Sequence, residues 1–176
     1  MERRSTLEKA SSPMFKYAWL EESNSVSGHF AEGIADLLRQ LSSTPRTLDR
    51  TVVEAIGRSP NVHLLLALRE EVPVGMLTLA TLDLLSGRKA VIEDVVVDAH
   101  WRGKGVAETL VRRAVQRARN FGAQKVDLTS RPDRLSGNRL YEKCGFERRE
   151  TNSFRLRLPI REPSGASLNA PARESS

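Results

Sequence analysis

The chain has 176 residues, enough for one domain with a full core, and its 39% apolar and 28% charged residues are typical of a soluble globular protein with some unstructured sequence attached. A single cysteine, Cys144, excludes an internal disulfide framework and fits a reducing compartment. No apolar run approaches the ~18 residues of a membrane span and residues 1–13 lack a signal peptide's apolar core, so we expect a cytoplasmic protein without a membrane partner.

The first half of the chain predicts one strand, two helices and the start of an antiparallel meander. Residues 1–14 are polar and contain Pro13, which is typical of a disordered leader. The expected elements that follow are a strand over 15–20, a helix from Ser25 or Ser27 to before Pro45, a shorter helix from Thr47 or Asp49 to Gly57, and strands over 61–70 and 72–85. Glu70 and Glu71 form the polar turn between these two strands.

A buried strand, a glycine-containing turn and an amphipathic helix occupy residues 91–122. The strand over 91–97 is a β-branched run broken by Glu93 and Asp94. Apolar residues then recur at helical spacing from Val106 onward, and Gly122 marks the expected end of the helix.

The C-terminal third predicts a parallel strand, a short helix and two further strands. A strand over 125–129 follows a helical crossover and should therefore lie parallel to 91–97. After a loop over 131–137, the expected elements are a short helix over 138–144, a strand that starts over 146–149 and a last strand over 153–158. Residues from Pro159 onward are rich in Pro, Ser and Ala, which is typical of a disordered tail.

The turn over 102–107 has the chemistry of an anion site. The first N–H groups of a helix have no intrahelical partner and lie at the positive end of the helix dipole, where a phosphate binds well. Gly103 and Gly105 allow positive φ and a close approach to a ligand, while Arg102 and Lys104 add positive charge. The spacing is that of neither a P-loop nor the dinucleotide fingerprint. An ordinary strand-to-helix turn with solvated basic residues is the alternative.

Positive charge is concentrated between Arg102 and Arg119, where six basic residues stand against one acidic residue in a chain of formal charge +6. Such a cluster either attracts an anionic ligand or is a solvated helix face. It has no interleaved aromatic residues and no nucleic-acid-binding motif, which argues against a nucleic-acid partner.

Three segments together resemble the GNAT superfamily of acyl-CoA-dependent N-acetyltransferases. They are the strand EDVVV over 93–97, the turn R-x-x-G-x-A over 102–107 and the segment NRLYEKCGF over 138–146. That family carries [QR]-x-x-G-x-[GA] on the turn that holds the coenzyme A pyrophosphate, and N-x-x-L/F-Y-x-x-x-G-F near the C-terminus. The resemblance covers roughly 16–158, with the motifs in the expected order and separation.

The resemblance implies an α+β, three-layer GNAT fold in one domain over 15–159, and the composition of 160–176 predicts a disordered tail after it. It implies a mixed, mostly antiparallel sheet of six or seven strands with about four helices, in which two central parallel strands splay apart in a V. Acetyl-CoA would be the cosubstrate, bound by the turn and by backbone groups of the central strand. The residues expected to bind it are Val95, Val96, Val97, Arg102, Gly103, Lys104, Gly105, Val106, Ala107, Asn138 and Tyr141.

Two residues are expected to be catalytic. Tyr141 matches the tyrosine that in many relatives donates a proton to the departing coenzyme A sulfur; the alternative is a half-buried aromatic with a satisfied hydroxyl. Glu93 is the candidate base or water-positioning residue, because carboxylates in an apolar strand are either paired or functional. The alternative is a salt bridge from Glu93 to Lys89 or Arg131. Side chains alternate along a strand, so only one of Glu93 and Asp94 is expected to face the cleft.

Among the members of the family that share the IEDVVV strand are sugar-phosphate acetyltransferases, and in them the glutamate that matches Glu93 lies in the active site. Those relatives have a second acidic residue at the position of Thr129, so this chain would have one acidic group fewer for acid–base catalysis. Cys144 has no histidine near it in sequence, which disfavours an acetyl-cysteine route, and the three histidines lack metal-ligand spacing, so no metal is expected.

The expected reaction is therefore direct attack by a primary amine, of a small molecule or a peptide, on acetyl-CoA in a ternary complex. Two alternatives stay open: a non-catalytic acyl-CoA-binding or regulatory module, and a toxin-like acetyltransferase that acts on aminoacyl-tRNA. The acceptor has no signature, although Arg131, Arg134 and Arg139 would suit an acidic or phosphorylated one. The last strands would allow a homodimer.

Overall fold

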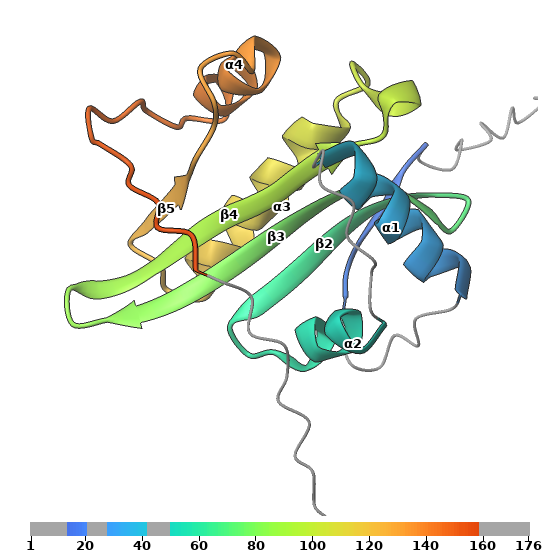
Figure 1. Cartoon of the computed structure of the whole chain (residues 1–176), viewed down its shortest axis with the longest axis horizontal. Helices are drawn as coiled ribbons and strands as arrows, with labels where there is room; N and C mark the ends of the chain where they lie inside the picture. Colours follow the sequence, from blue (N-terminus) through green and yellow to red (C-terminus); the bar gives the residue numbers. More distant parts are fainter. Residues whose placement is uncertain (1–13, 21–27, 42–49, 159–176) are drawn as a thin grey trace, which may run out of the picture.

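The structure is a computed structural model that describes residues 14–20, 28–41 and 50–158. Within these ranges the chain forms one mixed sheet with helices on both faces (Figure 1). The expected leader and tail, and the expected starts of the first two helices, lie outside the described residues. None of the helices described is long and apolar enough to cross a membrane.

The order of elements follows the sequence prediction up to residue 144. In chain order they are β1 (Lys16–Trp19), α1 (Gly28–Leu41), α2 (Arg50–Arg58), β2 (Val62–Arg69), β3 (Val72–Leu84), β4 (Gly87–Val97), the 3₁₀ helix η1 (Ala99–Trp101), α3 (Val106–Asn120), β5 (Lys125–Leu128) and α4 (Leu135–Lys143). The strands lie in the order β1-β2-β3-β4-β5, antiparallel throughout except that β5 runs parallel to β4. The antiparallel meander and the parallel crossover strand are confirmed.

Alternating apolar residues build a core on each face of the sheet. From β2, Leu65 and Ala67 join the cluster under α3, whereas Leu64 and Leu66 join the cluster under α1 and α2. The helices supply matching stripes, with Leu110 of α3 fully buried. Figure 1 shows α3 behind the sheet and α1 in front of it. Apolar burial on both faces, at roughly 25 cal/mol per Å², holds the three layers together.

Helix α1 lies very close to the start of β3. A Cβ built on Gly33 would lie 2.7 Å from Cδ and 3.0 Å from Cγ of Pro73, and real Cβ atoms do not come this close to a ring carbon. The absence of a side chain at Gly33 therefore lets α1 settle onto the sheet. This contact sets the distance between α1 and the sheet. The C-terminal half of α1 faces the cavity described below.

The sheet has five strands among the described residues, and the expectation of six or seven is wrong for this part of the chain. The strands predicted over 146–149 and 153–158 do not form, since these residues have no regular structure. The alternation of Phe154, Leu156 and Leu158 with arginines is typical of a strand with one buried face. Here, however, the three apolar residues are 91%, 85% and 77% exposed, because no described element covers them.

Candidate active site

Strands β4 and β5 pair over a short stretch and then diverge. Their parallel register runs from Lys89 opposite Lys125 to Ile92 opposite Leu128, whereas β4 continues to Val97. Beyond Ile92, this side of β4 has no neighbouring strand among the described residues. The V-shaped splay expected at the centre of the sheet is therefore present.

A β-bulge lies in β4 beside this splay. Thr78 pairs with Glu93 and Met76 pairs with Val96, so two residues of β4 stand opposite a single residue of β3. Asp94 takes up the extra length with φ +52°, and its carboxylate accepts a hydrogen bond from the Thr78 hydroxyl at 3.1 Å. A bulge breaks the alternation of side chains. The prediction that only one of Glu93 and Asp94 faces the cleft is thus wrong, because both line the same cavity.

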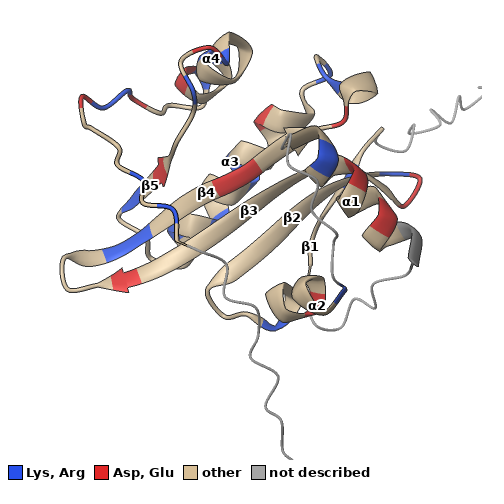
Figure 2. Ribbon diagram, viewed as in Figure 1, with Lys and Arg blue, Asp and Glu red and all other residues tan. Residues whose placement is uncertain are grey.

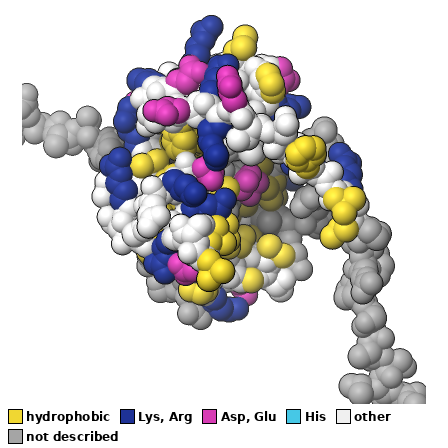
Figure 3. All heavy atoms as spheres, turned by 90° about the vertical axis from the view of Figure 1, so that its left-hand side faces the viewer, with side chains coloured by type: hydrophobic (Ala, Val, Ile, Leu, Met, Phe, Trp, Pro, Cys, Tyr) yellow, Lys and Arg dark blue, Asp and Glu magenta, His cyan; other side chains and the backbone are white. Residues whose placement is uncertain are grey.

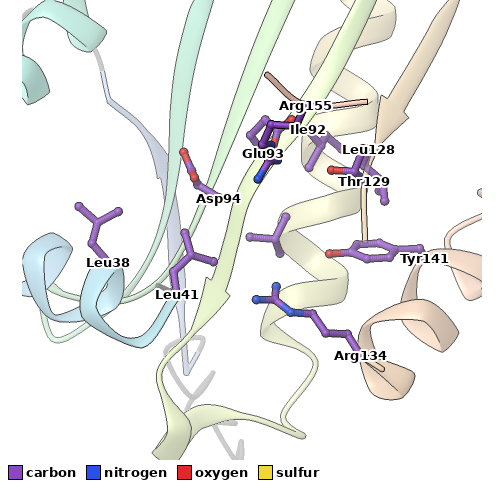
Figure 4. Close-up of a pocket in the computed structure, with 11 residues that line it drawn as sticks. Leu38, Leu41, Ile92, Glu93, Asp94, Leu128, Thr129, Arg134, Tyr141 and Arg155 are labelled. Carbon is purple, nitrogen blue, oxygen red and sulfur yellow. The ribbon is translucent and has the colours of Figure 1, made fainter. Parts of the chain in front are cut away.

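A cavity of about 410 Å³ occupies the splay (Figure 4). Its walls come from α1, β4, β5 with the loop after it, α4 and the C-terminal segment, through Leu38, Leu41, Ile92, Glu93, Asp94, Val95, Leu128, Thr129, Arg134, Tyr141 and Arg155. The volume is that of a small-molecule site. The structure thus brings together the two predicted catalytic residues, which are 48 positions apart in sequence (93 to 141).

Tyr141 projects from α4 with its hydroxyl directed toward β4 (Figure 4). Its ring is half-buried and meets Phe146 edge to face, with ring centroids 6.2 Å apart. Burial raises the pKa of the phenol above its ordinary value, Cys144 raises it further, and the charge of Arg134 lowers it. Tyr141 therefore keeps its proton at neutral pH, as a general acid must.

Glu93 must be ionised to accept a proton, and its neighbours shift its pKa in opposite directions. Burial and the neighbouring Asp94 charge both raise the pKa of Glu93, whereas the Arg155 guanidinium lowers it. The result is a pKa above the ordinary value of a glutamate, which suits a group that accepts a proton near neutral pH. Figure 4 shows Arg155 beside Glu93 on the wall of the cavity.

The salt bridges considered for Glu93 are not present. Lys89 pairs instead with Asp127 of β5, with its Nζ 3.4 Å from Oδ2, and Arg131 pairs with Asp133, with its Nε 3.6 Å from Oδ1. The cation that acts on Glu93 is instead Arg155, from a segment that the sequence predicted as a strand. No local pattern marks this arginine, because its approach to β4 depends on the path of the chain after α4.

The turn after η1 has the geometry expected of an anion cradle. Gly103 and Gly105 have φ +76° and +79°, and a Cβ built on either would meet nothing within 4 Å. The first helical hydrogen bond of α3 runs from the Thr109 N–H to the Gly105 carbonyl at 3.1 Å. The N–H groups of Val106, Ala107 and Glu108 precede it and have no intrahelical acceptor. These free donors and the open space around both glycines fit a pyrophosphate group.

The two cations of the turn are already held in place. Arg102 Nε donates to the Val97 carbonyl at 3.0 Å, which fastens the turn to the end of β4. Lys104 Nζ lies 4.3 Å from the centre of the Trp101 ring, a cation–π contact. Both cations of the turn are therefore fixed by contacts with neighbouring residues.

The remaining predicted coenzyme residues differ in what they face. Val95 lines the cavity, whereas the side chain of Val96 is buried in the core under α1 and only its backbone is available. Asn138 Nδ2 donates to the carbonyls of Arg131 and Pro132 at 3.2 and 3.3 Å, so its amide holds the loop before α4. Its role toward the coenzyme stays a prediction.

A glutamine clip that the sequence did not reveal joins two walls of the site. Gln40 of α1 donates from Nε2 to Asp98 Oδ2 at 2.7 Å and accepts from the Ala99 N–H at 3.1 Å. The clip ties the helix that carries Leu38 and Leu41 to the loop that leads into the turn. An exposed glutamine in an amphipathic helix carries no signal of such a contact.

Charge is distributed unevenly around the cavity. Figure 2 shows an acidic stretch midway along β4, and Figure 3 shows basic side chains beside acidic ones on the face turned toward the viewer.

Cys144 is half-buried at the end of α4, and burial raises the pKa of its thiol, so little of it is the thiolate that a covalent route requires. Among the described residues no group of His, Cys, Asp and Glu is arranged to hold a metal ion.

Comparison with known proteins agrees with this geometry. Residues 15–146 match the acetyltransferase (GNAT) family. Over 126 residues the chain is 37% identical to glucosamine 6-phosphate N-acetyltransferase 1 of Oryza sativa subsp. japonica, covering 66% of this chain and 74% of that protein. An acetyltransferase of Trypanosoma brucei superposes with a TM-score of 0.66 at 27% identity, covering 82% of this chain and 99% of that one.

A glucosamine-6-phosphate N-acetyltransferase from Arabidopsis thaliana superposes with a TM-score of 0.68, over 82% of this chain and 99% of that one. At 24% identity this likeness concerns the fold. The region that matches the family model, residues 15–146, contains β1 to α4, and thus the splayed strands, the glycine turn and the helix that carries Tyr141. The chain belongs to the acetyltransferase (GNAT) family.

Proposed function

We propose that this protein transfers the acetyl group of acetyl-CoA to the primary amine of a small anionic acceptor, by direct attack in a ternary complex. The observation that carries the proposal is the cavity at the splay, which Glu93 and Tyr141 both line and which two arginines also reach. Bound acetyl-CoA supplies an activated acetyl group as a thioester, and every other group in the reaction comes from the chain or the acceptor.

Glu93 is the group that prepares the acceptor. A primary amine with a pKa near ~10 is mostly protonated at pH 7 and must lose a proton before its nitrogen can attack. A carboxylate with a raised pKa accepts this proton, directly or through one water, at a pH where it is still ionised. The nitrogen then forms a bond to the acetyl carbon as the bond from that carbon to sulfur breaks.

Tyr141 takes part in the second proton transfer. The leaving thiolate needs a proton, and a half-buried phenol that is neutral at pH 7 can donate one from the α4 side of the cavity. The nitrogen still carries one surplus proton after the attack, and this proton passes to the Tyr141 oxygen, directly or through water, which restores the phenol. A backbone N–H of β4 beyond Ile92, left without a neighbouring strand, polarises the thioester carbonyl. The free N–H groups at the start of α3, with Arg102 and Lys104, hold the pyrophosphate.

The acceptor we propose is a phosphorylated amino sugar, of the kind that the name of the rice relative specifies. Arg134, which precedes α4, and Arg155, from the C-terminal segment, both line the cavity, and guanidinium groups bind phosphate through paired hydrogen bonds. The volume of about 410 Å³ suits a monosaccharide better than a peptide chain. Hence the amine and the anion of the acceptor are recognised by different residues.

A thiol-release assay with acetyl-CoA and a panel of amines tests this proposal. The panel contains glucosamine 6-phosphate, unphosphorylated glucosamine, an aminoglycoside, free amino acids and a peptide, alongside calorimetric titration with acetyl-CoA. We expect micromolar binding of acetyl-CoA and release that depends on the phosphorylated sugar. Binding without release from any amine would favour a non-catalytic acyl-CoA-binding module, and absence of binding would contradict the assignment of the turn.

A further inference from the structure

Helix α4 carries Tyr141, whose half-buried ring packs against the core cluster under α3, but the helix has few other contacts with the rest of the molecule. None of its residues is buried, and irregular chain flanks it on both sides, over 129–134 and 144–158. Figure 1 shows α4 standing apart from the sheet, beyond the end of β5. A helix in this situation needs contacts of its own to keep one orientation.

One carboxylate supplies such contacts. Glu108 lies in the first turn of α3, and its Oε2 accepts from Lys143 Nζ at 2.6 Å, at the last residue of α4. Its Oε1 accepts from Arg112 Nε at 3.1 Å. Arg112 Nη2 reaches in turn to the Lys143 carbonyl at 3.5 Å, so the end of α4 is held through both side chain and backbone.

This network differs from an isolated surface ion pair. The Glu108 side chain is 24% exposed while those of Arg112 and Lys143 are 54% and 66% exposed, and each of the two Glu108 oxygens has a cationic partner. Hydrogen bonds to Lys143 and Arg112 lower the pKa of Glu108 below its ordinary value, so the carboxylate stays ionised throughout the neutral range. Networks with several partners and restricted geometry contribute more than single exposed pairs.

We propose that Glu108 is a positioning residue, whose carboxylate ties α4 to α3 and so holds the Tyr141 hydroxyl over the cavity. The proposal rests on the proton-donor role proposed above for Tyr141. Lys143 is two residues beyond Tyr141 in the same helix, so a rotation or lifting of α4 that breaks the network also moves the phenol.

The same contacts explain how an acidic residue is accommodated beside the proposed pyrophosphate cradle. Glu108 is the only acidic residue between Arg102 and Arg119, and it belongs to the turn whose N–H groups would face the phosphates. An unpaired carboxylate there would repel an anion. Its two cationic partners offset that charge, so the residue can hold α4 without weakening the cradle.

The Glu108→Gln variant tests the proposal through kcat, KM and the pH profile. We expect kcat to fall about 3- to 10-fold, as for loss of a modest ion-pair network, with little change in the KM for acetyl-CoA. A loosened α4 hydrates Tyr141 and lowers its pKa toward the ordinary value, so the alkaline limb of the profile moves to lower pH. Amide hydrogen exchange over residues 138–143 becomes faster.

Two further variants make the test specific. Glu142→Gln removes an ion pair of α4 with Arg148, which is 2.8 Å away on the segment that follows the same helix, and should leave kcat and exchange unchanged. Lys143→Met removes the cation of α4 that Glu108 binds, and should reproduce the faster exchange and the moved alkaline limb. Unchanged exchange and an unmoved alkaline limb in both Glu108→Gln and Lys143→Met would overturn the proposal.

The outcomes also separate this proposal from the one it rests on. If Tyr141→Phe leaves turnover unchanged, the donor role fails, and the effect of Glu108 on catalysis fails with it. Hydrogen exchange would then still report whether Glu108 holds α4. If Tyr141→Phe is impaired and Glu108→Gln behaves like the wild type in both readouts, the fault lies in the positioning role alone.

Discussion

Two ionisable side chains with shifted pKa values line the cavity from different elements. Glu93 on β4 and Tyr141 on α4 both have raised pKa values, and in each case burial is the largest cause. The same physical effect prepares one group to accept a proton and keeps the other protonated. At the scale of single residues, the proposed chemistry thus depends on one shared, partly dehydrated space.

Replacing Tyr141 with Phe removes the proposed proton donor and little else, because the ring and its contact with Phe146 remain. We expect kcat to fall about 100-fold, within the usual range for loss of a general acid, with a nearly unchanged KM for acetyl-CoA. Steady-state thiol release measures both. Tyr17→Phe is the matched control, since the only other tyrosine lies on β1 under the Arg113 guanidinium, 4.9 Å from its ring centre.

Replacing Arg155 with Met removes the charge that lowers the pKa of Glu93. The pKa of Glu93 should then rise further, so more of the base is protonated at a given acidic pH. We expect the acidic limb of the kcat/KM profile to move to higher pH, together with a higher KM for an anionic acceptor. Arg157→Met, an exposed arginine two residues away that does not line the cavity, should leave both unchanged. If the acidic limb does not move in Arg155→Met, the charge of Arg155 has no effect on the pKa of Glu93.

At the scale of elements, the contact between α1 and β3 sets one wall of the site. Gly33→Ala would bring a methyl group to 2.7 Å from the Pro73 ring, which cannot bend away as a flexible chain would. Overpacking of this kind costs about 1–3 kcal/mol, and we expect a clearly lower midpoint of thermal unfolding. Gly137→Ala in α4 is the control, since its added Cβ would be 3.7 Å from the nearest atom, an ordinary contact, and alanine favours helix.

The elements that carry a strong period of their own could be predicted from the sequence. The stripe of α3 and the meander of β2 to β4 are examples, since local spacing suffices to define them. The bulge at Asp94 could not, because it exists only in the register between β4 and β3. The last strand was predicted from a correct alternation, but a strand also needs a neighbour, and residues 153–158 have none in the part of the chain that the structure describes.

The site shows the same division between local and distant information. The turn residues and Tyr141 belong to short motifs that can be read from the sequence, and their roles stay predictions. Arg155, Gln40 and the network around Glu108 join segments that are far apart in sequence. Their roles follow from the path of the chain, which composition and spacing do not contain.

At the scale of the whole molecule, one buried histidine links stability to pH. His63 is 8% exposed, stacks on Phe121 with ring centroids 4.8 Å apart and meets Trp19 edge to face. Burial lowers its pKa below 6.5, the charge of Arg117 lowers it further, and a backbone hydrogen bond to Pro60 opposes both. The folded protein therefore keeps this imidazole neutral.

Since the unfolded chain binds a proton near pH 6.5 and the folded one only at lower pH, unfolding takes up a proton between these two values. The stabilising contribution of neutral His63 is present above pH 6.5 and declines as the pH falls toward the folded pKa. We expect the midpoint of thermal unfolding to fall between pH 7.5 and 5.5. His63→Gln should flatten this dependence, whereas His100→Gln, which removes a side chain that is 87% exposed, should not.

The segment after α4, which no described element covers, has a consequence for how the protein behaves in concentrated solution. Phe154, Leu156 and Leu158 could pair with identical segments of other copies if nothing interrupted them. Arg155 and Arg157 alternate with these apolar residues, and like charges brought into register oppose such aggregation. Arg155 would therefore serve both solubility and the acid–base chemistry of Glu93, so its replacement is expected to promote aggregation as well as to change activity.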